Sequence, residues 1–256
     1  MPRPLPCPDR CNVLLVGGGG REHALAWKLR QSNRLGDLWL TDGTNAGLAK
    51  LGRVMDEPFD LNNAFRTSRW CDRHSIHLVV VGPEAPLAAG AADVLTTDKR
   101  LVFGPTKAGA QLEADKAFAK QLMRTAAIPT AEARIFRSAD QAIAYLESRE
   151  DAIVVKASGL AAGKGVIVCD TPAEAIEAVQ RSMVERAFGE AGSSIVIEER
   201  LTGQEVSVLA LTDGRSICTL PPCQDHKQVG EGDVGPNTGG MGAYCRTPGI
   251  DEAMLD

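Results

Sequence analysis

The sequence predicts an α/β fold in two domains, and two patterns indicate this. In the first part of the chain, short apolar runs alternate with helical patterns, as in a parallel sheet whose strands are joined by crossover helices. In the second part, β-branched apolar runs flank glycine-rich turns, which favours antiparallel strands in an α+β domain. We place the boundary after residue 114, so the predicted domains span residues 1–114 and 115–256.

The elements of the first domain follow from its apolar runs and helical periodicities. Strands are predicted at residues 13–16, 38–40, 77–81 and 101–103. Helices are predicted at residues 21–31 and 61–73. The turn Gly104-Pro105-Thr106 ends this unit.

The second domain opens with a predicted helix over residues 114–127, because Phe118, Leu122 and Met123 recur at helical spacing. Strands are predicted at residues 131–136, 152–156, 166–169, 194–199 and 205–211. Helices are predicted at residues 140–147 and 172–186.

Composition limits the partners of the protein. The net charge is −5 and the lysines and arginines are scattered, so we expect no nucleic-acid partner. No window approaches the roughly eighteen apolar residues of a membrane helix, and no apolar segment suited to export precedes Val13. The seven cysteines lack CxxC spacing, which argues against a zinc ribbon or a disulfide framework. We therefore expect a cytoplasmic protein with reduced thiols and no membrane partner.

A strand that runs into four glycines, Gly17 to Gly20, and then into a helix is the first candidate site. The GxGxxG dinucleotide fingerprint fails in both registers, because Glu22 and His23 stand where glycine is needed. Backbone N–H groups at this helix start, with Arg21, can instead hold a phosphomonoester, and the alternative is a simple tight turn. The loops at residues 42–47 and 82–87 follow other strands and should reach the same sheet edge.

A second candidate site spans residues 156–166, between two β-branched strands. It is not a Walker loop, because Ser158 and Gly165 break that pattern, so a P-loop kinase fold is disfavoured. We predict a flexible hairpin that closes over phosphates, with charge from Lys156 and Lys164; the alternative is an ordinary glycine-rich hairpin.

Acidic residues lie at and just after the end of the strand predicted at residues 194–199. Glu198 and Glu199 stand at its end and Glu205 lies in the next turn, which suits recognition of a nucleoside; the alternative is exposed acids.

The segment at residues 224–244 combines many glycines with the charged triplet Asp225, His226 and Lys227. We predict that it forms no regular structure and folds around a small ionic ligand. The alternative is a long flexible surface loop, which compact domains rarely carry without a use.

Nearly the whole chain resembles the glycinamide ribonucleotide synthetases, or phosphoribosylamine–glycine ligases, of the ATP-grasp superfamily. The motifs that carry the resemblance are GGREHALAWKL (19–29), NAG (45–47), VVGPEAPL (80–87), FGPT (103–106), KAF (116–118), GLAAGKGV (159–166), IVIEERL (195–201), QDHK (224–227) and DVGPNTGGMGAY (233–244). The resemblance implies a Rossmann-like, substrate-binding pre-ATP-grasp domain at residues 1–114. It implies an ATP-grasp domain at residues 115–256 that is incomplete at its C-terminus.

The resemblance also implies roles for individual residues. It implies that Lys116 and Lys156 contact the ATP phosphates and that the loop of Gly163, Lys164 and Gly165 covers these phosphates. It assigns the adenine hinge to Glu198, Glu199 and Leu201, and the ribose to Glu205. It assigns phosphoribosylamine and glycine to Gly19, Gly20, Arg21, Glu22, Asn45, Gly47, Pro83, Glu84, Asp225, His226, Lys227, Asn237, Thr238, Gly239, Gly240 and Met241. The implied catalytic residues are Lys156, Lys164, His226 and Lys227.

The implied reaction joins glycine to 5-phosphoribosylamine with ATP in purine biosynthesis, through a glycyl phosphate, in a complete protein that is a monomer. The implied metal is Mg²⁺ or Mn²⁺, but the ExNxRxGDPE segment that supplies its ligands in the family does not occur before Asp256, so no metal ligand is predicted in this chain. We therefore expect a C-terminally truncated ligase, inactive alone. The alternatives are a remnant that binds nucleotide or ribose phosphate, and a related ATP-grasp ligase with another acceptor.

The chain departs from the family pattern at three positions: Ala114-Asp115 replaces a Gly-Ser pair, Ser158 replaces an acid, and Thr44 replaces a proline.

Overall fold

The computed structural model describes residues 8–161, 163–232, 234–250 and 252–254. The chain forms two compact units, residues 1–119 and 120–256, and divides between them inside helix α6 (Lys116–Thr125). The predicted boundary at residue 114 lies just before this helix. None of the described helices is both long and apolar enough to cross a membrane.

Unit 1 is built on a parallel sheet, as the sequence predicts. Among the described residues this sheet has five strands in the order β3-β2-β1-β4-β5. The strands are β1 (Cys11–Val16), β2 (Leu35–Leu40), β3 (Arg53–Val54), β4 (Ile76–Val81) and β5 (Leu101–Phe103). Leu14 opposes Trp39 on one side and Val79 on the other, which makes β1 the centre of the sheet. The strand order reverses between β1 and β4, because β2 and β3 are added on one side of β1 and β4 and β5 on the other. Parallel sheets of this kind bind ligands at such a switch point.

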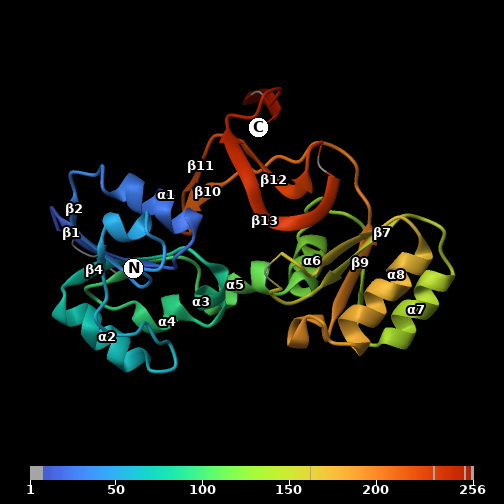
Figure 1. Ribbon diagram of the computed structural model, residues 1–256, viewed down its shortest axis with the longest axis horizontal. Coiled ribbons are helices and arrows are strands. Elements are labelled where there is room, and N and C mark those ends of the chain that lie inside the picture. Colours follow the sequence, from blue (N-terminus) through green and yellow to red (C-terminus); the bar gives the residue numbers. More distant parts are fainter. Residues whose placement is uncertain (1–7, 162, 233, 251, 255–256) are drawn as a thin grey trace. The chain divides into compact units, whose positions relative to one another are not determined.

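Helices cover both faces of the sheet, and strand alternation explains the two cores. Figure 1 shows α1 (Gly20–Leu29) on one side of the sheet and α2 on the other. Val13 and Leu15 point to the face covered by α1, whereas Leu14 and Val16 pack on the other face with Trp70 of α2. The elements of that second face are α2 (Ala64–Arg73), α3 (Glu84–Ala88), α4 (Ala91–Leu95) and α5 (Lys107–Ala114). Both faces of β1 are buried, which accounts for its continuous apolar run.

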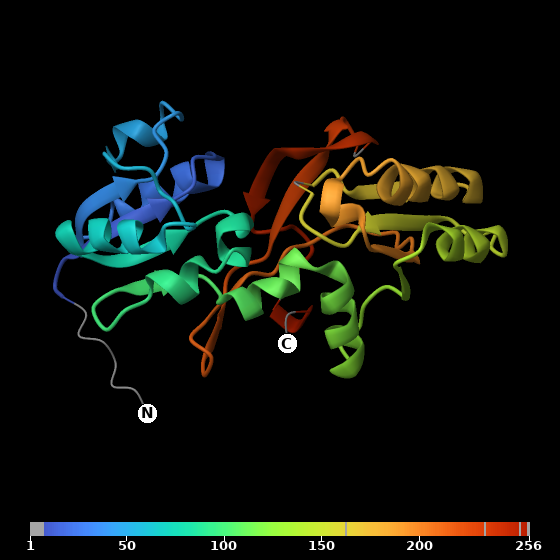
Figure 2. The same ribbon diagram turned by 90° about the horizontal axis from the view of Figure 1, so that it is seen from below.

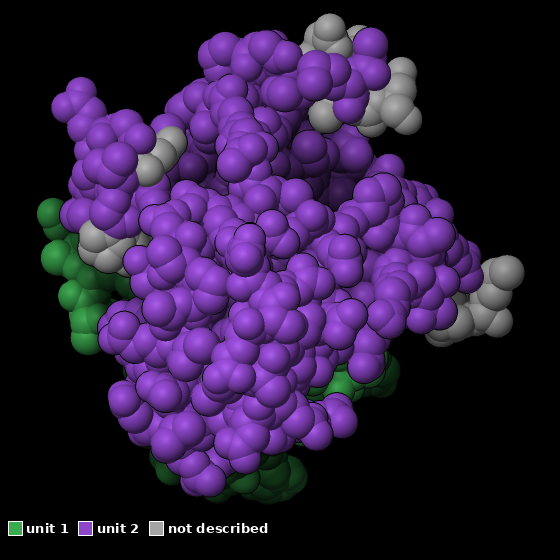
Figure 3. Space-filling view, turned by 90° about the vertical axis from the view of Figure 1, so that its right-hand side faces the viewer, with its two compact units in different colours: residues 1–119 green, residues 120–256 purple. Residues whose placement is uncertain are grey.

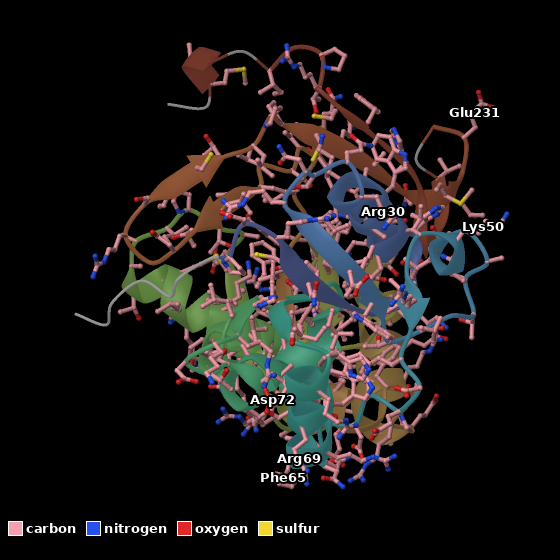
Figure 4. All side chains as sticks on the ribbon, turned by 90° about the vertical axis from the view of Figure 1, so that its left-hand side faces the viewer. Arg30, Lys50, Phe65, Arg69, Asp72 and Glu231 are labelled. Atoms are coloured by element: carbon pink, nitrogen blue, oxygen red, sulfur yellow. The ribbon has the colours of Figure 1, made fainter. Side chains whose placement is uncertain are left out.

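The outer surface of α2 carries an aromatic and a basic side chain side by side. Phe65 is exposed, and the Arg69 guanidinium lies 5.7 Å from its ring centroid (Figure 4).

The single helix predicted over residues 114–127 is wrong at its start. Helix α5 ends at Ala114, Asp115 is extended, and α6 begins at Lys116. The Asp115 carboxylate accepts a hydrogen bond from the Phe118 N–H at 3.1 Å, so Asp115 caps α6 instead of continuing α5.

Unit 2 contains an antiparallel sheet with the strand order β6-β9-β7-β8. Its elements are β6 (Ala133–Phe136), α7 (Ala139–Glu147), β7 (Ile153–Ala157), β8 (Val166–Cys169), α8 (Pro172–Val179) and β9 (Ile195–Glu199). Helices α7 and α8 lie side by side over one face (Figure 2). Ile153, Val155, Ile195 and Ile197 point into that helical core. The alternate residues of β7 and β9 therefore face away from the helices.

The predicted helix over residues 172–186 is shorter than expected. Helix α8 ends at Val179, and residues Gln180–Val184 form a π-helical turn, η2, with the Glu185 N–H donating to the Gln180 carbonyl.

The segment at residues 224–244 does form regular structure, so the prediction of an irregular loop is wrong. It lies in an antiparallel ribbon of β12 (Cys223–Gly230) and β13 (Val234–Cys245). Register shifts near Gln228 and positive φ angles at Gly235, Gly240 and Gly242 let the strands pair despite the irregular sequence. The glycines that argue against a strand in the sequence permit this bulged one.

The strand predicted at residues 205–211 is also mostly wrong. Ser207 makes an isolated bridge to Cys223, and the described strands are β10 (Ala210–Thr212) and β11 (Ile217–Thr219). The remaining short helical turns of the chain are η1 (Leu48–Lys50), η3 (Gly189–Gly192) and η4 (Glu252–Met254).

Helix α6 ends in a left-handed residue that is not glycine. Ala127 has φ = 53°, and the Ile128 N–H donates to the Met123 carbonyl at 2.9 Å, as in a Schellman C-cap. We expect Ala127→Gly to raise the free energy of unfolding by about 0.5–1 kcal/mol, because glycine has no Cβ penalty at positive φ. Ala119→Gly, within the helix, should lower it by a similar amount. Denaturant unfolding measures both, and a destabilised Ala127→Gly would contradict this description of the cap.

Candidate functional site

The sheet of unit 2 turns its helix-free face toward a cleft. Val154 and Lys156 alternate on β7, and Glu198 follows them on β9, where it opposes Val154. Lys156 opposes Val196, so Lys156 and Glu198 are diagonal neighbours on adjacent strands. The pleat of the two strands therefore sets a cation beside a buried acid.

This cleft has a volume of about 980 Å³ and lies wholly within unit 2. Its lining includes the predicted residues Lys156, Glu198, Glu199, Leu201, Glu205, Asp225, His226 and Lys227. The surface of unit 2 is hollowed above the middle of the view in Figure 3. The fold thus brings together the strand-end acids, the first-strand lysine and the charged triplet, which lie far apart in the sequence.

Glu198 is the most buried charged group of the cleft. Its side chain is 5% exposed, and each carboxylate oxygen lies against a different lysine. Oε1 pairs with Lys156 Nζ, and Oε2 lies 2.7 Å from Lys120 Nζ. A buried carboxylate needs such partners, because the loss of hydration costs several kcal/mol per ion.

The ribbon and the segment that precedes it also line the cleft. Gln224 is buried, and its side-chain oxygen accepts hydrogen bonds from Gln204 Nε2 at 2.9 Å and from the Tyr244 hydroxyl at 2.5 Å. The His226 ring lies 5.8 Å from the Tyr244 ring, centroid to centroid. These contacts position His226 beside the cleft.

Lys227 extends from the ribbon to Glu205. Its ammonium donates to Glu205 Oε2 at 2.9 Å and lies 3.8 Å from Asp225 Oδ2. The hydrogen bond to Glu205 raises the pKa of Lys227, while burial acts in the opposite direction. Glu205 and Lys227, predicted for ribose and for substrate, are therefore partners in this structure.

Glu199 and Leu201 follow Glu198 in the lining but differ in their contacts. Glu199 Oε1 accepts a hydrogen bond from the Glu132 N–H at 2.8 Å, which ties the end of β9 to the residue before β6. Leu201 is 69% exposed. The side chain of Glu199 is thus engaged with backbone.

The predicted lid joins β7 to β8, and Ala162 within it lies outside the described residues. Gly163 has φ = 75°, and Lys164 is exposed. A Cβ built on Gly165 would come within 2.7 Å of the Ala161 Cβ, so Gly165 is required for packing of the hairpin itself. A Cβ on Gly163 would lie 3.9 Å from the Thr238 carbonyl, which brings the lid close to β13.

Among the predicted residues of β13 whose side chains are described, none lines the cleft. Thr238 donates from its hydroxyl to the Lys227 carbonyl at 2.8 Å, and the Gly240 N–H donates back to that hydroxyl. Gly239 is exposed, Met241 is 57% exposed, and the side chain of Asn237 lies outside the described residues. Lys116 is the half-buried first residue of α6 and belongs to unit 1.

In unit 1, Glu22 organises the glycine loop after β1. Its buried carboxylate accepts a hydrogen bond from the Gly19 N–H at 2.6 Å and completes a capping box at the start of α1. A Cβ added at Gly17 or Gly82 would collide with this side chain. Glu22 therefore joins the loops after β1 and β4, and Gly19 has its N–H engaged.

The remaining rim residues are also linked across loops. Arg21 donates to the Gly82 carbonyl at 2.5 Å and lies 3.6 Å from Glu84, and Asn45 donates to the Gly18 carbonyl at 3.2 Å. Gly47 donates its N–H to the Asn45 side chain. Pro83 caps α3 and packs against Gly17, while Gly20 is exposed, with nothing within 4 Å of an added Cβ.

Asp42, at the start of the loop that follows β2, is an acid that the residue-level prediction omitted. The Thr44 N–H, and secondly the Thr44 hydroxyl, donate to it and lower the pKa of the carboxyl below its usual value. The predicted convergence of three loops at the carboxyl edge of the sheet is thus seen in unit 1.

Sequence reasoning also missed Lys120, Gln204, Gln224 and Tyr244. For Lys120 a signal existed: it stands four residues after Lys116, hence on the same face of α6. The hydrogen-bonded partners of Gln224 lie on other segments, so nothing local marks it.

The resemblance leads us to expect Mg²⁺ or Mn²⁺ in the complete protein. Among the described residues, no group of three or more His, Cys, Asp or Glu side chains can hold a metal ion. We derive no step through Mg²⁺ or Mn²⁺.

The parallel α/β unit and the antiparallel sheet that follows it belong to the ATP-grasp class, as the comparisons with known proteins show. Two family models match in succession: "Phosphoribosylglycinamide synthetase, N domain" over residues 11–113 and "Phosphoribosylglycinamide synthetase, ATP-grasp (A) domain" over residues 114–256. The chain belongs to the phosphoribosylglycinamide synthetase family.

Individual relatives agree with this family. The chain is 52% identical over 254 residues to a phosphoribosylamine–glycine ligase of Rhodopirellula baltica, covering 96% of this chain and 57% of the relative. It is 49% identical over 244 residues to the human trifunctional purine biosynthetic protein adenosine-3, covering 95% of this chain and 24% of that protein. The crystal structure of a phosphoribosylamine–glycine ligase from Thermotoga maritima matches with a TM-score of 0.74 and 30% identity, covering 91% of this chain and 55% of that one. The chain therefore spans about half the length of the single ligases that it matches.

Replacing Glu22 tests its place in the loop. Glu22→Ala leaves the Gly19 N–H without its carboxylate and opens space beside Gly17, so we expect a loss of about 1–3 kcal/mol in the free energy of unfolding. Glu22→Gln, which retains an acceptor oxygen, should lose less. Denaturant unfolding followed by tryptophan fluorescence measures both, and a Glu22→Ala variant as stable as the parent would refute this reading.

The Glu205–Lys227 pair predicts a pH dependence. Because the folded-state pKa of Lys227 is raised above 10.5, the stabilisation is complete below the unfolded pKa and is lost as pH rises through the folded pKa. Glu205→Gln should bring the pKa of Lys227 down, as measured by NMR titration of its side-chain signals. Glu231→Gln removes a charge from the exposed turn after β12 and should leave this pKa unchanged (Figure 4). Equal titration in the Glu205→Gln variant and the parent would contradict the pairing.

Proposed function

We propose that the protein to which this chain belongs joins glycine to 5-phosphoribosylamine with ATP and releases glycinamide ribonucleotide, ADP and phosphate. The observation that carries the proposal is the cleft of unit 2 that unites Lys156, the strand end at residues 198–201, Glu205 and the charged triplet at residues 225–227. Family membership and the printed names of the relatives support the substrates.

The nucleotide occupies this cleft in the proposal. Residues 198–201 line the cleft where β9 ends, and Glu199 is its last paired residue, so the backbone that follows is suited to the adenine edge. Glu205 takes the ribose hydroxyls and exchanges its bond to Lys227 for bonds to the sugar. Lys156, with Lys164 of the lid and Lys116 of α6, neutralises the phosphates.

Two substitutions make up the proposed reaction. The glycine carboxylate oxygen attacks the γ-phosphorus of ATP, the bond to the β,γ-bridging oxygen breaks, and ADP leaves. The amine of phosphoribosylamine then attacks the acyl carbon of glycyl phosphate, phosphate leaves, and the new amide nitrogen releases a proton. Neither step needs a covalent nucleophile from the protein, so positioning and charge neutralisation by Lys156 and Lys164 contribute most of the catalysis.

The ribbon and unit 1 hold the other substrates in this proposal. Asp225, His226, Lys227 and the β13 segment at residues 237–241 face glycine and the acyl phosphate, with His226 oriented by Tyr244. The amino-terminal domain binds the ribose phosphate through Gly19, Gly20, Arg21, Glu22, Asn45, Gly47, Pro83 and Glu84. Glu22 acts there by shaping the loop, because its carboxylate is buried against the Gly19 N–H.

The proposal also covers the setting in which the protein works. We assign the protein to the cytoplasm, where thiols stay reduced. We assign it small-molecule substrates and a monomeric complete form.

Nucleotide binding by this chain tests the placement of ATP. Lys156→Met removes a charge-assisted bond to phosphate, so the Kd for ATP measured by calorimetry should rise roughly tenfold or more. Lys50→Met, at an exposed position of unit 1, removes the same charge elsewhere and should leave the Kd unchanged. A Lys156→Met variant that binds ATP like the parent would overturn the placement.

The reaction itself is tested on the full-length protein that contains this chain. Phosphate release from ATP should require glycine and 5-phosphoribosylamine together. Equal release when another amino acid replaces glycine would point instead to an ATP-grasp ligase with a different acceptor.

A further inference from the structure

Lys120 lies beside the cleft without lining it. Its side chain is 14% exposed, and its ammonium contacts three groups: Glu198 Oε2 at 2.7 Å, the Thr130 hydroxyl at 2.8 Å and the Ala131 carbonyl at 2.9 Å. The contacts with Thr130 and Ala131 are hydrogen bonds, and the contact with Glu198 is an ion pair. Lys120 is therefore held in place from α6 and from the segment before β6.

Lys156 is held differently. It is 28% exposed, projects from β7 into the cleft and pairs with the other oxygen of Glu198. Glu198 thus has one lysine that is fixed outside the cleft and one that reaches into it. The side chain of Glu198 is buried, so its carboxylate cannot be hydrated in place of a lysine that moves away.

This arrangement determines what phosphate binding costs. When Lys156 turns from Glu198 to a phosphate, the buried carboxylate loses one of its two cations. Lys120 keeps it neutralised, and the change is therefore a transfer of Lys156 between two anions. Without Lys120 the same movement leaves a buried charge with no cation, which is strongly unfavourable.

We propose that Lys120 is a positioning residue, which keeps the Glu198 carboxylate neutralised so that Lys156 can leave it and bind the nucleotide phosphates. This inference rests on the proposed function, because it takes the cleft as the nucleotide site. In this proposal Lys120 acts on the nucleotide only through Glu198 and Lys156.

Four proteins and two ligands test the inference by calorimetry: the parent chain, Lys120→Met, Glu198→Gln and the double variant Lys120→Met/Glu198→Gln, each with ATP and with adenosine. Lys120→Met should weaken ATP binding about tenfold or more, since a buried unpaired carboxylate results. The double variant should recover most of this loss, because the neutral amide that Glu198→Gln introduces needs no cation. Adenosine has no phosphate to draw Lys156 away, so its affinity should stay within about twofold in all four proteins.

The matched control is Arg124→Met, which removes an exposed cation from the same helix one turn further on. It should leave both affinities unchanged. If Lys120→Met weakens adenosine as much as ATP, or if the double variant shows no recovery, Lys120 serves only the structure and the proposal is overturned. A parent chain that binds no ATP would instead refute the proposed function.

A second measurement needs no variant. In NMR spectra of the parent chain, ATP should shift the side-chain signals of Lys156 strongly, and those of Lys120 should keep the shifts of an ion-paired lysine. Loss of the Lys120 ion-pair shifts on ATP addition would show that Lys120 moves to the phosphates, which contradicts a positioning role.

Discussion

The buried carboxylate of Glu198 is the constraint on which the nucleotide cleft depends. It lies at the end of the β9 strand, on the face that α7 and α8 leave uncovered. A charge at this position is tolerated only with cations on both oxygens, and these come from β7 and α6. The ion pairs thus tie the part of α6 that belongs to unit 2 to the sheet, and they orient the lysine that faces the cleft.

Unit 1 solves a related problem with a second buried acid. Glu22 lies beneath the loops after β1 and β4, and its contacts explain why Gly17 and Gly82 have no side chains. The residues that the sequence predicts to bind ligands therefore divide into two groups. Some, such as Lys156, face open space, whereas Glu22 and Gly165 shape the backbone that presents the site.

The sequence predicted the parts of the fold whose signals are local. Residues 13–16 and 77–81 form apolar runs because both faces of β1 and much of β4 are buried, and the βαβ order follows from them. The two-residue β3 and the short α3 and α4 carry too little periodicity to detect. The ribbon at residues 223–245 escaped prediction because its glycines mark bulges within paired strands, and sequence alone does not distinguish these from a loop.

The candidate site was predictable to a similar extent. Lys156 and Glu198 could be found because each stands on a strand with a motif around it, and the cleft unites them. Lys120 and Gln224 could not be found, because their importance lies in partners far along the chain. Sequence patterns identify groups that meet a ligand more readily than groups that hold those residues in place.

Hydrogen exchange with a non-hydrolysable ATP analogue tests most directly whether the cleft of unit 2 holds the nucleotide. We predict slower amide exchange on binding in residues 154–169, 196–205 and 223–228, with the loop at residues 17–22 unchanged. Protection confined to the loops of unit 1, with none in the unit 2 cleft, would contradict it.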